Sequence, residues 1–244
     1  MIEIRNLCKT YRGRGRRRVE ALHGVTLECR PGQVYGLIGP NGAGKTTALR
    51  IISTALRPTA GGGVVMGYDI VKQSRRVREN IGFLAANSGL YARLSAREVL
   101  RYFGRLYRLS EEQIRTRIIE LAETFQMQEF LDRACDKLST GMAQKVNIAR
   151  TVIHAPPVMV FDEPTTGLDV LTSRSIVQFI RRCKQEERTV ILSTHIMAEV
   201  EKLCDRVGII HAGRLLFDGT IAELRERCGA DLDEAFVQLI GETA

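Results

Sequence analysis

Long hydrophobic runs are what this chain of 244 residues most clearly lacks, although 44% of its residues are hydrophobic. Its longest apolar stretches, such as Val158 to Phe161 and Thr189 to Leu192, have the length of a strand, whereas about 20 residues are needed to span a bilayer. If the protein serves a membrane, we therefore expect another chain to cross it. At 244 residues the chain is long for one domain and short for two, which favours one domain with a subdomain inserted in it. The sequence also lacks internal repeats and low-complexity linkers.

Closely spaced cysteines are missing as well. The six cysteines are scattered along the chain without a C-x-x-C pair, and we expect no secretory leader before them. This distribution is typical of reduced cytosolic thiols and argues against a metal site built from them. The residues concerned are Cys8, Cys29, Cys135, Cys183, Cys204 and Cys228.

Positive charge is plentiful, with a net charge of +8 and a pI of about 9.4. This balance suits an anionic partner, but charge alone does not distinguish a nucleotide, a lipid headgroup and a nucleic acid. Much of the charge lies in a glycine-interleaved run without helix or strand periodicity. We interpret it as a solvated surface loop, with contact to a membrane surface or to phosphate as the alternative. The run comprises Arg12, Arg14, Arg16, Arg17 and Arg18, and a second cluster with the same interpretation comprises Arg75, Arg76 and Arg78.

The first third of the chain has the pattern of strands followed by a glycine loop and a helix. Alternating or short apolar segments predict a small antiparallel sheet from Ile2 to Leu7, Val25 to Cys29 and Gly63 to Met66. Gln33 to Ile38 has the pattern of a buried strand that enters the glycine loop, and Thr46 to Ala55 continues as a helix without Gly or Pro.

The pattern becomes helical between about Leu94 and His154, where apolar residues recur every three to four positions. Ser110, followed by two acids and Gln113, is a typical helix start. We expect an inserted helical subdomain here, with helices over Arg97 to Arg108, Glu111 to Phe125 and Met142 to His154. Beyond it, strands alternate with helices, which is typical of parallel βαβ construction. The expected strands are Val158 to Phe161, Thr189 to Ser193 and Arg206 to Ile210, and the expected helices are Val170 to Lys184, Ile196 to Leu203 and short amphipathic ones from Thr220.

A glycine-rich segment from Gly39 to Thr46 fits the P-loop pattern of two glycines followed by Lys and Thr, between a strand and a helix. Glycines let backbone N–H groups curl around phosphates, and the following helix adds its positive N-terminal end. Lys45 would reach the β- and γ-phosphates, and the Thr46 hydroxyl would bind magnesium. The alternative is a glycine turn with a chance Lys-Thr pair. The expected nucleotide-binding residues are Gly39, Pro40, Asn41, Gly42, Ala43, Gly44, Lys45, Thr46 and Thr47.

Two acids, Asp162 and Glu163, follow the hydrophobic strand Val158 to Phe161. A strand of this kind delivers carboxylates to the edge of a nucleotide site, where Asp162 would hold magnesium. The alternative interpretation is a pair of strand-end acids that cap a helix.

The segment Leu138-Ser139-Thr140-Gly141-Met142 lies between the P-loop and this acid pair. By itself a Ser before a helix is a common N-cap. Taken in chain order with the other two segments, it resembles the signature of the ATP-binding cassette (ABC) ATPases, the motor subunits of membrane transporters. In that family the signature completes the ATP site of a partner, so Ser139 and Gly141 are expected to bind ATP in trans.

The resemblance implies an α/β fold with a P-loop NTPase (RecA-like) core, an N-terminal antiparallel β-subdomain and an inserted α-helical subdomain. Within a single domain over residues 1–244, we assign 1–93 and 155–219 to the nucleotide-binding core with its β-subdomain. Residues 94–154 are then the helical subdomain with the signature, and 220–244 are a helical tail.

The resemblance also implies the site chemistry. Glu163 would be the general base, and His195, after Ser193-Thr194, would be the switch histidine near the γ-phosphate, although lone histidines are often structural. Tyr11 stands where relatives stack an aromatic ring on adenine, and mere packing is the alternative. Pro164 to Asp169 matches the D-loop, which crosses the dimer interface, and Asp169 also suits the N-cap of the next helix. We expect Glu163, His195 and Lys45 to be catalytic.

Two departures from the commonest family pattern indicate which branch of the family this chain resembles. Thr140 and Met142 replace a glycine and a glutamine of the signature, and Ala85, Ala86 and Asn87 occupy the region where most relatives carry a magnesium-sensing glutamine. Both departures are similar to bacterial exporter ATPases of the sodium-extruding, NatA-type branch. Our hypothesis is that Asn87 or a water takes over the sensing role.

The sequence therefore predicts an ATP- and Mg²⁺-dependent ATPase that drives transport, with sodium or drug-like cargo in an exporter. We expect a second copy of this chain and integral membrane permease subunits as partners, a peripheral position at the cytoplasmic face of the cell membrane, and no nucleic acid. The alternatives are a soluble ABC protein acting on nucleic acid or ribosomes, supported by the basic charge, and a P-loop kinase, which leaves the signature unexplained.

Overall fold

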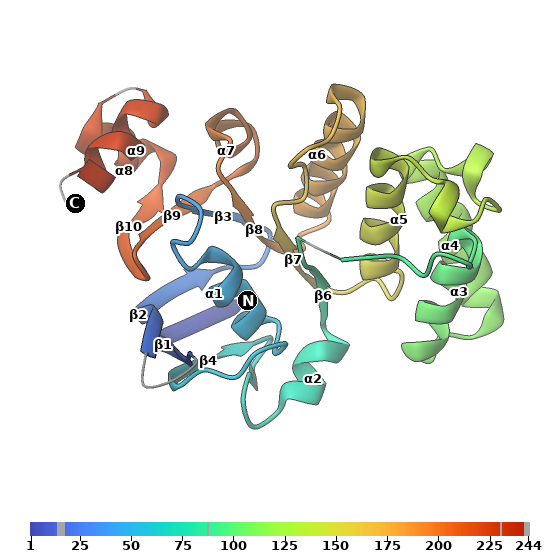
Figure 1. Ribbon diagram of the computed structural model, residues 1–244, viewed down its shortest axis with the longest axis horizontal. Helices are drawn as coiled ribbons and strands as arrows, with labels where there is room; N and C mark the ends of the chain where they lie inside the picture. The colour runs from blue at the N-terminus through green and yellow to red at the C-terminus, as the bar shows by residue number, and fades with distance from the viewer. Residues whose placement is uncertain (14–17, 87, 230, 242–244) are drawn as a thin grey trace.

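The computed structural model describes residues 1–13, 18–86, 88–229 and 231–241. Within these residues the strands form two sheets, one antiparallel with the order β2-β1-β4-β5 and one mainly parallel with the order β10-β9-β3-β8-β7-β6. We call them the antiparallel sheet and the main sheet. Figure 1 shows α1 between the two sheets, α6 and α7 above the main sheet, and a lobe of α3, α4 and α5 at one end.

The antiparallel sheet contains every strand predicted for it. Its members are β1 (Ile2–Arg12), β2 (Arg18–Cys29), β4 (Ala60–Val65) and β5 (Tyr68–Asp69). β1 and β2 are longer than predicted, because their register shifts at bulges and interrupts the alternation of apolar and polar residues. Arg12 and Arg18 pair across the end of this hairpin, so these two residues of the basic run are strand rather than loop. Arg14, Arg16 and Arg17 lie outside the described residues.

The main sheet consists of β3 (Val34–Ile38), β6 (Ile81–Leu84), β7 (Val158–Asp162), β8 (Thr189–Thr194), β9 (Arg206–His211) and β10 (Arg214–Thr220). All neighbours run parallel except β9 and β10. β10 was not predicted. It returns from β9 through Ala212 and Gly213, which both have positive φ (43° and 76°) and form a two-residue hairpin turn. A register shift between Leu215 and Phe217 hides the period-2 pattern of this strand.

The helices of the described chain agree with most of the predicted segments. They are α1 (Lys45–Ile52), α2 (Ser74–Glu79), α3 (Ala96–Leu106), α4 (Glu111–Phe125), α5 (Thr140–Val152), α6 (Val170–Gln185), α7 (Met197–Leu203), α8 (Ile221–Cys228) and α9 (Leu232–Gly241). α4 starts as predicted, because Ser110 and Gln113 form a reciprocal capping box. α5 begins two residues earlier than Met142, since the Ser139 side chain caps it. The short helix α2, with only Val77 buried, was not predicted.

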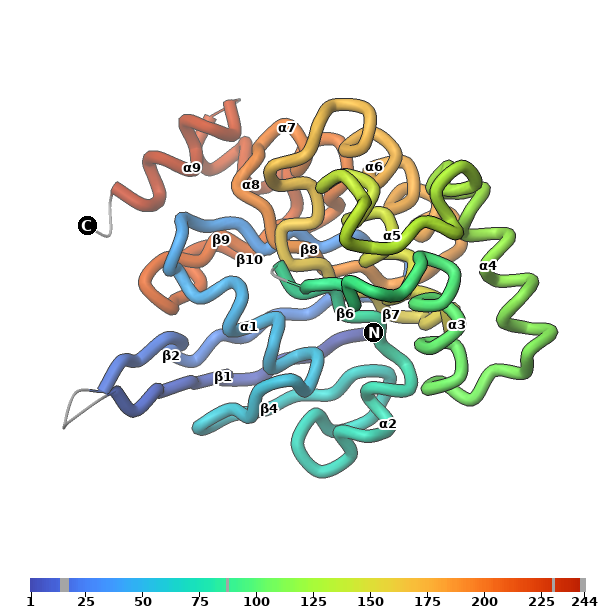
Figure 2. Tube along the Cα trace, turned by 45° about the vertical axis from the view of Figure 1, so that its right-hand side comes forward, coloured from blue at the N-terminus to red at the C-terminus, as the bar shows by residue number. Residues whose placement is uncertain are grey.

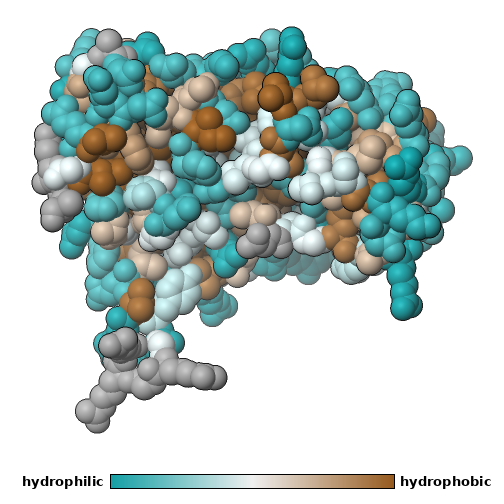
Figure 3. Space-filling model, turned by 45° about the horizontal axis from the view of Figure 1, so that its top comes forward, coloured by the Kyte–Doolittle hydropathy of each residue, from teal (hydrophilic) through white to brown (hydrophobic). Residues whose placement is uncertain are grey.

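The apolar core is divided by the main sheet into two layers. Alternate residues of β3 point to opposite faces: Val34 and Ile38 pack with the layer that includes α3 to α6, whereas Tyr35 and Leu37 pack with the layer around α1 and the antiparallel sheet. On the face seen in Figure 3, apolar side chains form small patches among polar ones. Figure 2 shows α3, α4 and α5 together, beside β6 and β7. These three helices belong to the segment 94–154, which we propose as the helical subdomain.

Candidate nucleotide-binding site

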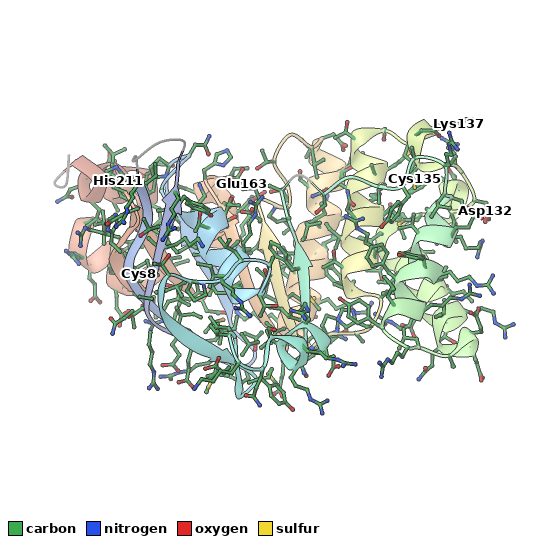
Figure 4. All side chains as sticks on the ribbon, turned by 60° about the horizontal axis from the view of Figure 1, so that its bottom comes forward. Cys8, Asp132, Cys135, Lys137, Glu163 and His211 are labelled. Atoms are coloured by element: carbon green, nitrogen blue, oxygen red, sulfur yellow. The ribbon has the colours of Figure 1, made fainter. Side chains whose placement is uncertain are left out.

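The carboxyl ends of three adjacent parallel strands bring the predicted site residues together. β3 leads into the P-loop and α1, β8 ends just before His195, and β7, on the other side of β8, ends at Asp162. Open α/β sheets bind ligands at this edge, since side chains from several strands converge there. Glu163 lies near the middle of the molecule in Figure 4, between the strands and the helical lobe.

The P-loop conformation depends on its glycines. Gly42 and Gly44 have φ of 81° and 112°, in the region that favours glycine. A Cβ on Gly39 would lie 2.2 Å from the carbonyl oxygen of Ile210, so this position has room for glycine only. Beside the loop is a cavity of about 140 Å³, lined by Ala21, Pro40, Asn41, Gly42, Gly44, Lys45, Thr46, Thr47 and Glu163.

One predicted loop residue points elsewhere. The side chain of Ala43 is 3% exposed and packs in the core layer around α1. Its carbonyl oxygen accepts a hydrogen bond from Gly213 N at 2.9 Å, which ties the loop to the turn before β10. Ala43 therefore supports the loop from below, and its backbone N–H donates to the carbonyl oxygen of Pro40 at 3.2 Å.

Lys45, the first residue of α1, is buried and bonded to the loop itself. Its ammonium donates to the carbonyl oxygens of Gly39 at 2.6 Å and Pro40 at 3.3 Å, and it lies 3.5 Å from Oε1 of Glu163. Only 5% of the side chain is exposed, so the charge needs these oxygens as partners. The ammonium is thus held at the cavity between the P-loop and the acid pair.

Asp162 is a buried carboxylate with one oxygen in use. Oδ1 accepts hydrogen bonds from the hydroxyls of Thr46 at 3.1 Å and Ser193 at 2.7 Å. Oδ2 is buried and has no partner among the described residues. A free carboxylate oxygen beside a threonine hydroxyl is an all-oxygen donor set, which fits the ligand preference of Mg²⁺.

Glu163 has an unusual backbone conformation. Its φ of 50° lies in the left-handed region, which is strained for a residue with a Cβ. Its N–H donates to both the carbonyl oxygen (3.2 Å) and the hydroxyl (3.0 Å) of Ser193. Oε2 accepts from the Thr166 hydroxyl at 3.2 Å and lies 3.6 Å from Nδ1 of His195, whose side chain is 45% exposed. Glu163 and His195, two of the three side chains predicted to be catalytic, are therefore neighbours.

Tyr11 lies at the end of β1, close to the start of α1. Its hydroxyl is 3.4 Å from Oγ1 of Thr47, and the Lys9 ammonium lies 5.2 Å from the ring centroid. The residue is 37% exposed, so one part of the ring is open to a ligand. This placement is compatible with adenine stacking beside the P-loop.

The signature residues lie apart from this cavity. Ser139 and Gly141 are at the start of α5 and do not line it. A Cβ on Gly141 would lie 2.7 Å from Oγ1 of Thr172 and 3.2 Å from Oδ2 of Asp169, so this glycine also has a packing role within its own chain. Asp169 caps α6, as predicted, and its hydrogen bonds from Thr172 lower the pKa of its carboxyl group.

Three residues that contact this site were not among those predicted from the sequence. Ser193 joins Asp162 to the backbone of Glu163, Gln144 donates to the carbonyl of Pro164 at 2.8 Å, and Glu199 accepts from the Thr165 hydroxyl at 2.9 Å. Ser193 could have been found, because a hydroxyl at the end of a buried strand beside the Asp162 strand is a polar group in need of a partner. Gln144 and Glu199 look like ordinary polar residues of helices. Asn87 lies outside the described residues.

Comparison with known proteins agrees with these features. The family model described as "ABC transporter" matches residues 22–166, which is more than half of the chain. The chain belongs to the ABC transporter family. This ABC protein is 46% identical, over 209 residues and 85% of each chain, to the ABC transporter ATP-binding protein NatA of Bacillus subtilis (strain 168). It is 37% identical over 223 residues, 91% of this chain and 71% of the other, to the daunorubicin resistance ATP-binding protein DrrA3 of Streptomyces coeruleorubidus. The predicted resemblance is confirmed.

Solved structures confirm the fold of this ABC protein. An ATP-binding subunit of an ABC transporter superposes with a TM-score of 0.89 and 31% identity, over 98% of this chain and 99% of that one. A dimeric ATP-binding cassette in a post-hydrolysis state, bound to ADP and Pi, superposes with a TM-score of 0.82 and 28% identity, over 91% and 99%. This ABC protein is thus an ATP-binding subunit of a transporter, and it hydrolyses ATP. Across the described ranges, each of its helices is too short or too polar to cross a membrane.

Proposed function

We propose that this ABC protein is the motor of an exporter, in which ATP hydrolysis drives a separate integral membrane permease. The observation that carries the proposal is the convergence of Lys45, Thr46, Asp162, Glu163 and His195 at one edge of the main sheet. These residues supply, within a few ångströms, a phosphate-binding cation, a magnesium-binding pair and a base.

Thr46 and Asp162 are the residues that would hold Mg²⁺, which, when bound, neutralises the charge that develops on the transferred phosphoryl group. The unpartnered Oδ2 of Asp162 supports this assignment within the part of the chain described. The backbone of residues 39–47 would bind the phosphates through its N–H groups and the N-terminus of α1. Tyr11 would stack on the adenine.

Glu163 acts in this proposal as the general base. Its carboxylate accepts a proton from the attacking water, while Lys45 holds the β- and γ-phosphates. A triphosphate offers Lys45 stronger acceptors than the carbonyls of Gly39 and Pro40, so substrate binding would draw the ammonium from the loop towards the phosphates. His195, 3.6 Å from the Glu163 carboxylate, would contact the γ-phosphate.

The active unit in this proposal is a dimer of two copies of this chain. Ser139 and Gly141 do not line the cavity beside the P-loop of their own chain, which supports a role at the ATP of the partner. The N-terminus of α5 would bring backbone N–H groups and a favourable dipole to that nucleotide. The first residues of α6, Val170 and Leu171, are 81% and 77% exposed, as suits a surface that a second copy covers.

The membrane partner and the cargo are proposed from the kind of relative. The similarity to an ABC transporter ATP-binding protein and to a daunorubicin resistance ATP-binding protein supports a transporter over a soluble ABC protein that acts on nucleic acid. Sodium or a drug-like molecule is the cargo that we propose for an exporter. The chain would then lie at the cytoplasmic face of the cell membrane, bound to the permease.

The direct test is reconstitution. The chain is purified with its native membrane partner and placed in vesicles, and ATP-dependent flux of sodium and of a drug-like cation is measured. We expect flux of one of them with the wild type and none with Lys45→Ala. Absence of any membrane partner, together with hydrolysis stimulated by nucleic acid in a salt-sensitive way, would reject the transporter and favour the alternative.

A further inference from the structure

The loop segment directly after Glu163 is held by hydrogen bonds from two different helices. Pro164 is buried and Thr165 is 4% exposed, whereas the next residues, Thr166 and Gly167, are exposed. A side chain of α5 donates one of these bonds to the segment, and a side chain of α7 accepts the other from it. Because the segment is covalently attached to the proposed base, these bonds act on the base through one or two peptide units.

The bond from α5 involves Gln144. Its side-chain amide donates to the carbonyl oxygen of Pro164 at 2.8 Å. Gln144 lies three positions after Gly141, on the face of α5 that packs against Thr172 at the start of α6. No other donor to the Pro164 carbonyl occurs in the described ranges, so loss of the amide would leave a buried acceptor unpaired.

The bond from α7 involves Glu199. Its Oε2 accepts from the Thr165 hydroxyl at 2.9 Å and from the Thr194 hydroxyl at 3.2 Å. Thr194 is 1% exposed and directly precedes His195. One carboxylate oxygen therefore joins the segment after Glu163 to the strand end before the switch histidine.

The side chain of Glu163 has little support of its own. Its contacts with Lys45 and His195 are 3.5 Å and 3.6 Å long, and the 3.2 Å bond from Thr166 comes from an exposed loop residue. The direction of the carboxylate therefore depends on the backbone, which is strained at φ 50° and keeps that conformation only where its surroundings enforce it.

We propose that Gln144 and Glu199 are positioning residues for Glu163, which fix the following segment and thereby the direction of the base. The proposal rests on the proposed role of Glu163 in hydrolysis. Misplacement of a reacting group by about 1 Å can lower a rate roughly a hundredfold, so loss of either bond should act on turnover rather than on ATP affinity. Because Gln144 belongs to α5, the helix that Ser139 caps, it also places the signature helix in direct contact with the segment after Glu163 in the same chain.

The first test is Gln144→Met, which keeps the length of the side chain and removes the donor. We expect kcat to fall roughly ten- to a hundredfold, with KM for ATP within about twofold of the wild type. Gln144→Lys, which keeps an N–H donor at similar reach, should recover most of kcat. Gln185→Met, at an exposed position at the end of α6, is the matched control and should leave both constants unchanged.

The second test uses the other helix. Glu199→Gln keeps an oxygen that accepts from both threonines and should retain most of kcat, whereas Glu199→Leu loses it and should resemble Gln144→Met. Glu226→Gln, at an exposed position of α8, is the control. The positioning role is wrong if both Gln144→Met and Glu199→Leu keep the wild-type kcat. It is also wrong if these variants lower kcat and raise KM together, and Gln144→Lys and Glu199→Gln do not recover the wild-type values.

Glu163→Gln, measured beside these variants, separates the two proposals. Full hydrolysis by Glu163→Gln would remove the base assignment and with it the proposed function of the site. An inactive Glu163→Gln beside fully active Gln144→Met and Glu199→Leu would leave that function intact and overturn only the positioning of the base by α5 and α7.

Discussion

Thr46 and Asp162, 116 positions apart in the chain, are joined by a 3.1 Å hydrogen bond from the threonine hydroxyl to Oδ1 of the aspartate. This bond connects the helix after the P-loop to the end of β7, and it leaves Oδ2 of Asp162 without a partner among the described residues. The hydroxyl and the carboxylate group that would hold Mg²⁺ are therefore already in contact. Little reorganisation of the protein is needed to form that site.

Asp162→Asn tests the magnesium pair. The amide keeps the shape of the side chain and loses the negative charge, so we expect hydrolysis to fall by on the order of a hundredfold or more and the apparent affinity for Mg²⁺ to weaken. Removal of Mg²⁺ with EDTA should abolish hydrolysis by the wild type. Hydrolysis measured against free Mg²⁺ checks both effects. Unchanged magnesium dependence in Asp162→Asn would contradict the assignment.

Glu163→Gln tests the base. Loss of a general base is expected to lower kcat by roughly 10²- to 10⁴-fold, while the isosteric amide leaves Lys45 free to bind phosphate. ATP should still bind, and a nucleotide-bound dimer should accumulate because hydrolysis no longer opens it. Light scattering with and without ATP measures the dimer, with Lys45→Ala as the control that should not form it. A monomer at saturating ATP would count against the dimer.

Gly141→Ala tests the packing of the signature helix. The new Cβ would lie 2.7 Å from Oγ1 of Thr172, a crowding effect of about 1–3 kcal/mol that the better helix propensity of alanine offsets by at most about 1 kcal/mol. We expect a net loss of roughly 1–2 kcal/mol in the free energy of unfolding, measured with urea. In a Thr172→Ala background the same change should be neutral or stabilising. An equal loss in both backgrounds would show that Thr172 is not the cause.

His154 predicts a pH dependence of stability. Its ring stacks on Tyr107 with centroids 3.5 Å apart, and burial, with a smaller effect of Arg117, lowers its pKa from 6.5 to about 4. As the pH falls below 6.5, the His154 ring is protonated in the unfolded chain, whereas in the folded chain it stays neutral down to about pH 4. The free energy of unfolding therefore decreases between these two pH values. At pH 5 the loss is about 2 kcal/mol, from about 1.4 kcal/mol per pH unit.

His154→Phe should remove this dependence and keep the stacking on Tyr107. Both ring nitrogens are buried, and no hydrogen bond of good geometry to either is found in the described structure, so an apolar ring fits the position. The free energies of unfolding of the two proteins, measured with urea at pH 7 and pH 5, should differ by about 2 kcal/mol more at pH 5 than at pH 7. Parallel losses in both proteins would place the acid sensitivity in other groups.

The sequence predicted the parts of the fold that are continuous along the chain. The P-loop follows a buried strand and precedes a helix, and Asp162 follows a buried strand, so local pattern was sufficient. The sequence pattern does not predict β10, because a register shift breaks its alternation of apolar and polar residues and its stability comes from pairing with β9. α5 starts two residues before the predicted Met142, because the Ser139 side chain caps the helix at this point.

By itself the sequence determined that this chain carries a P-loop pattern, an acid pair and a signature in the order of an ABC ATPase, and that its longest apolar stretches have the length of a strand. Only the tertiary structure decided which side chains meet. The backbone of Glu163 is strained, and hydrogen bonds to Glu163 and to the segment after it come from residues of three other elements, Ser193 of β8, Gln144 of α5 and Glu199 of α7. Hydrogen bonds of this kind depend on the order of strands in the sheet and on the packing of helices against it, which no local pattern encodes.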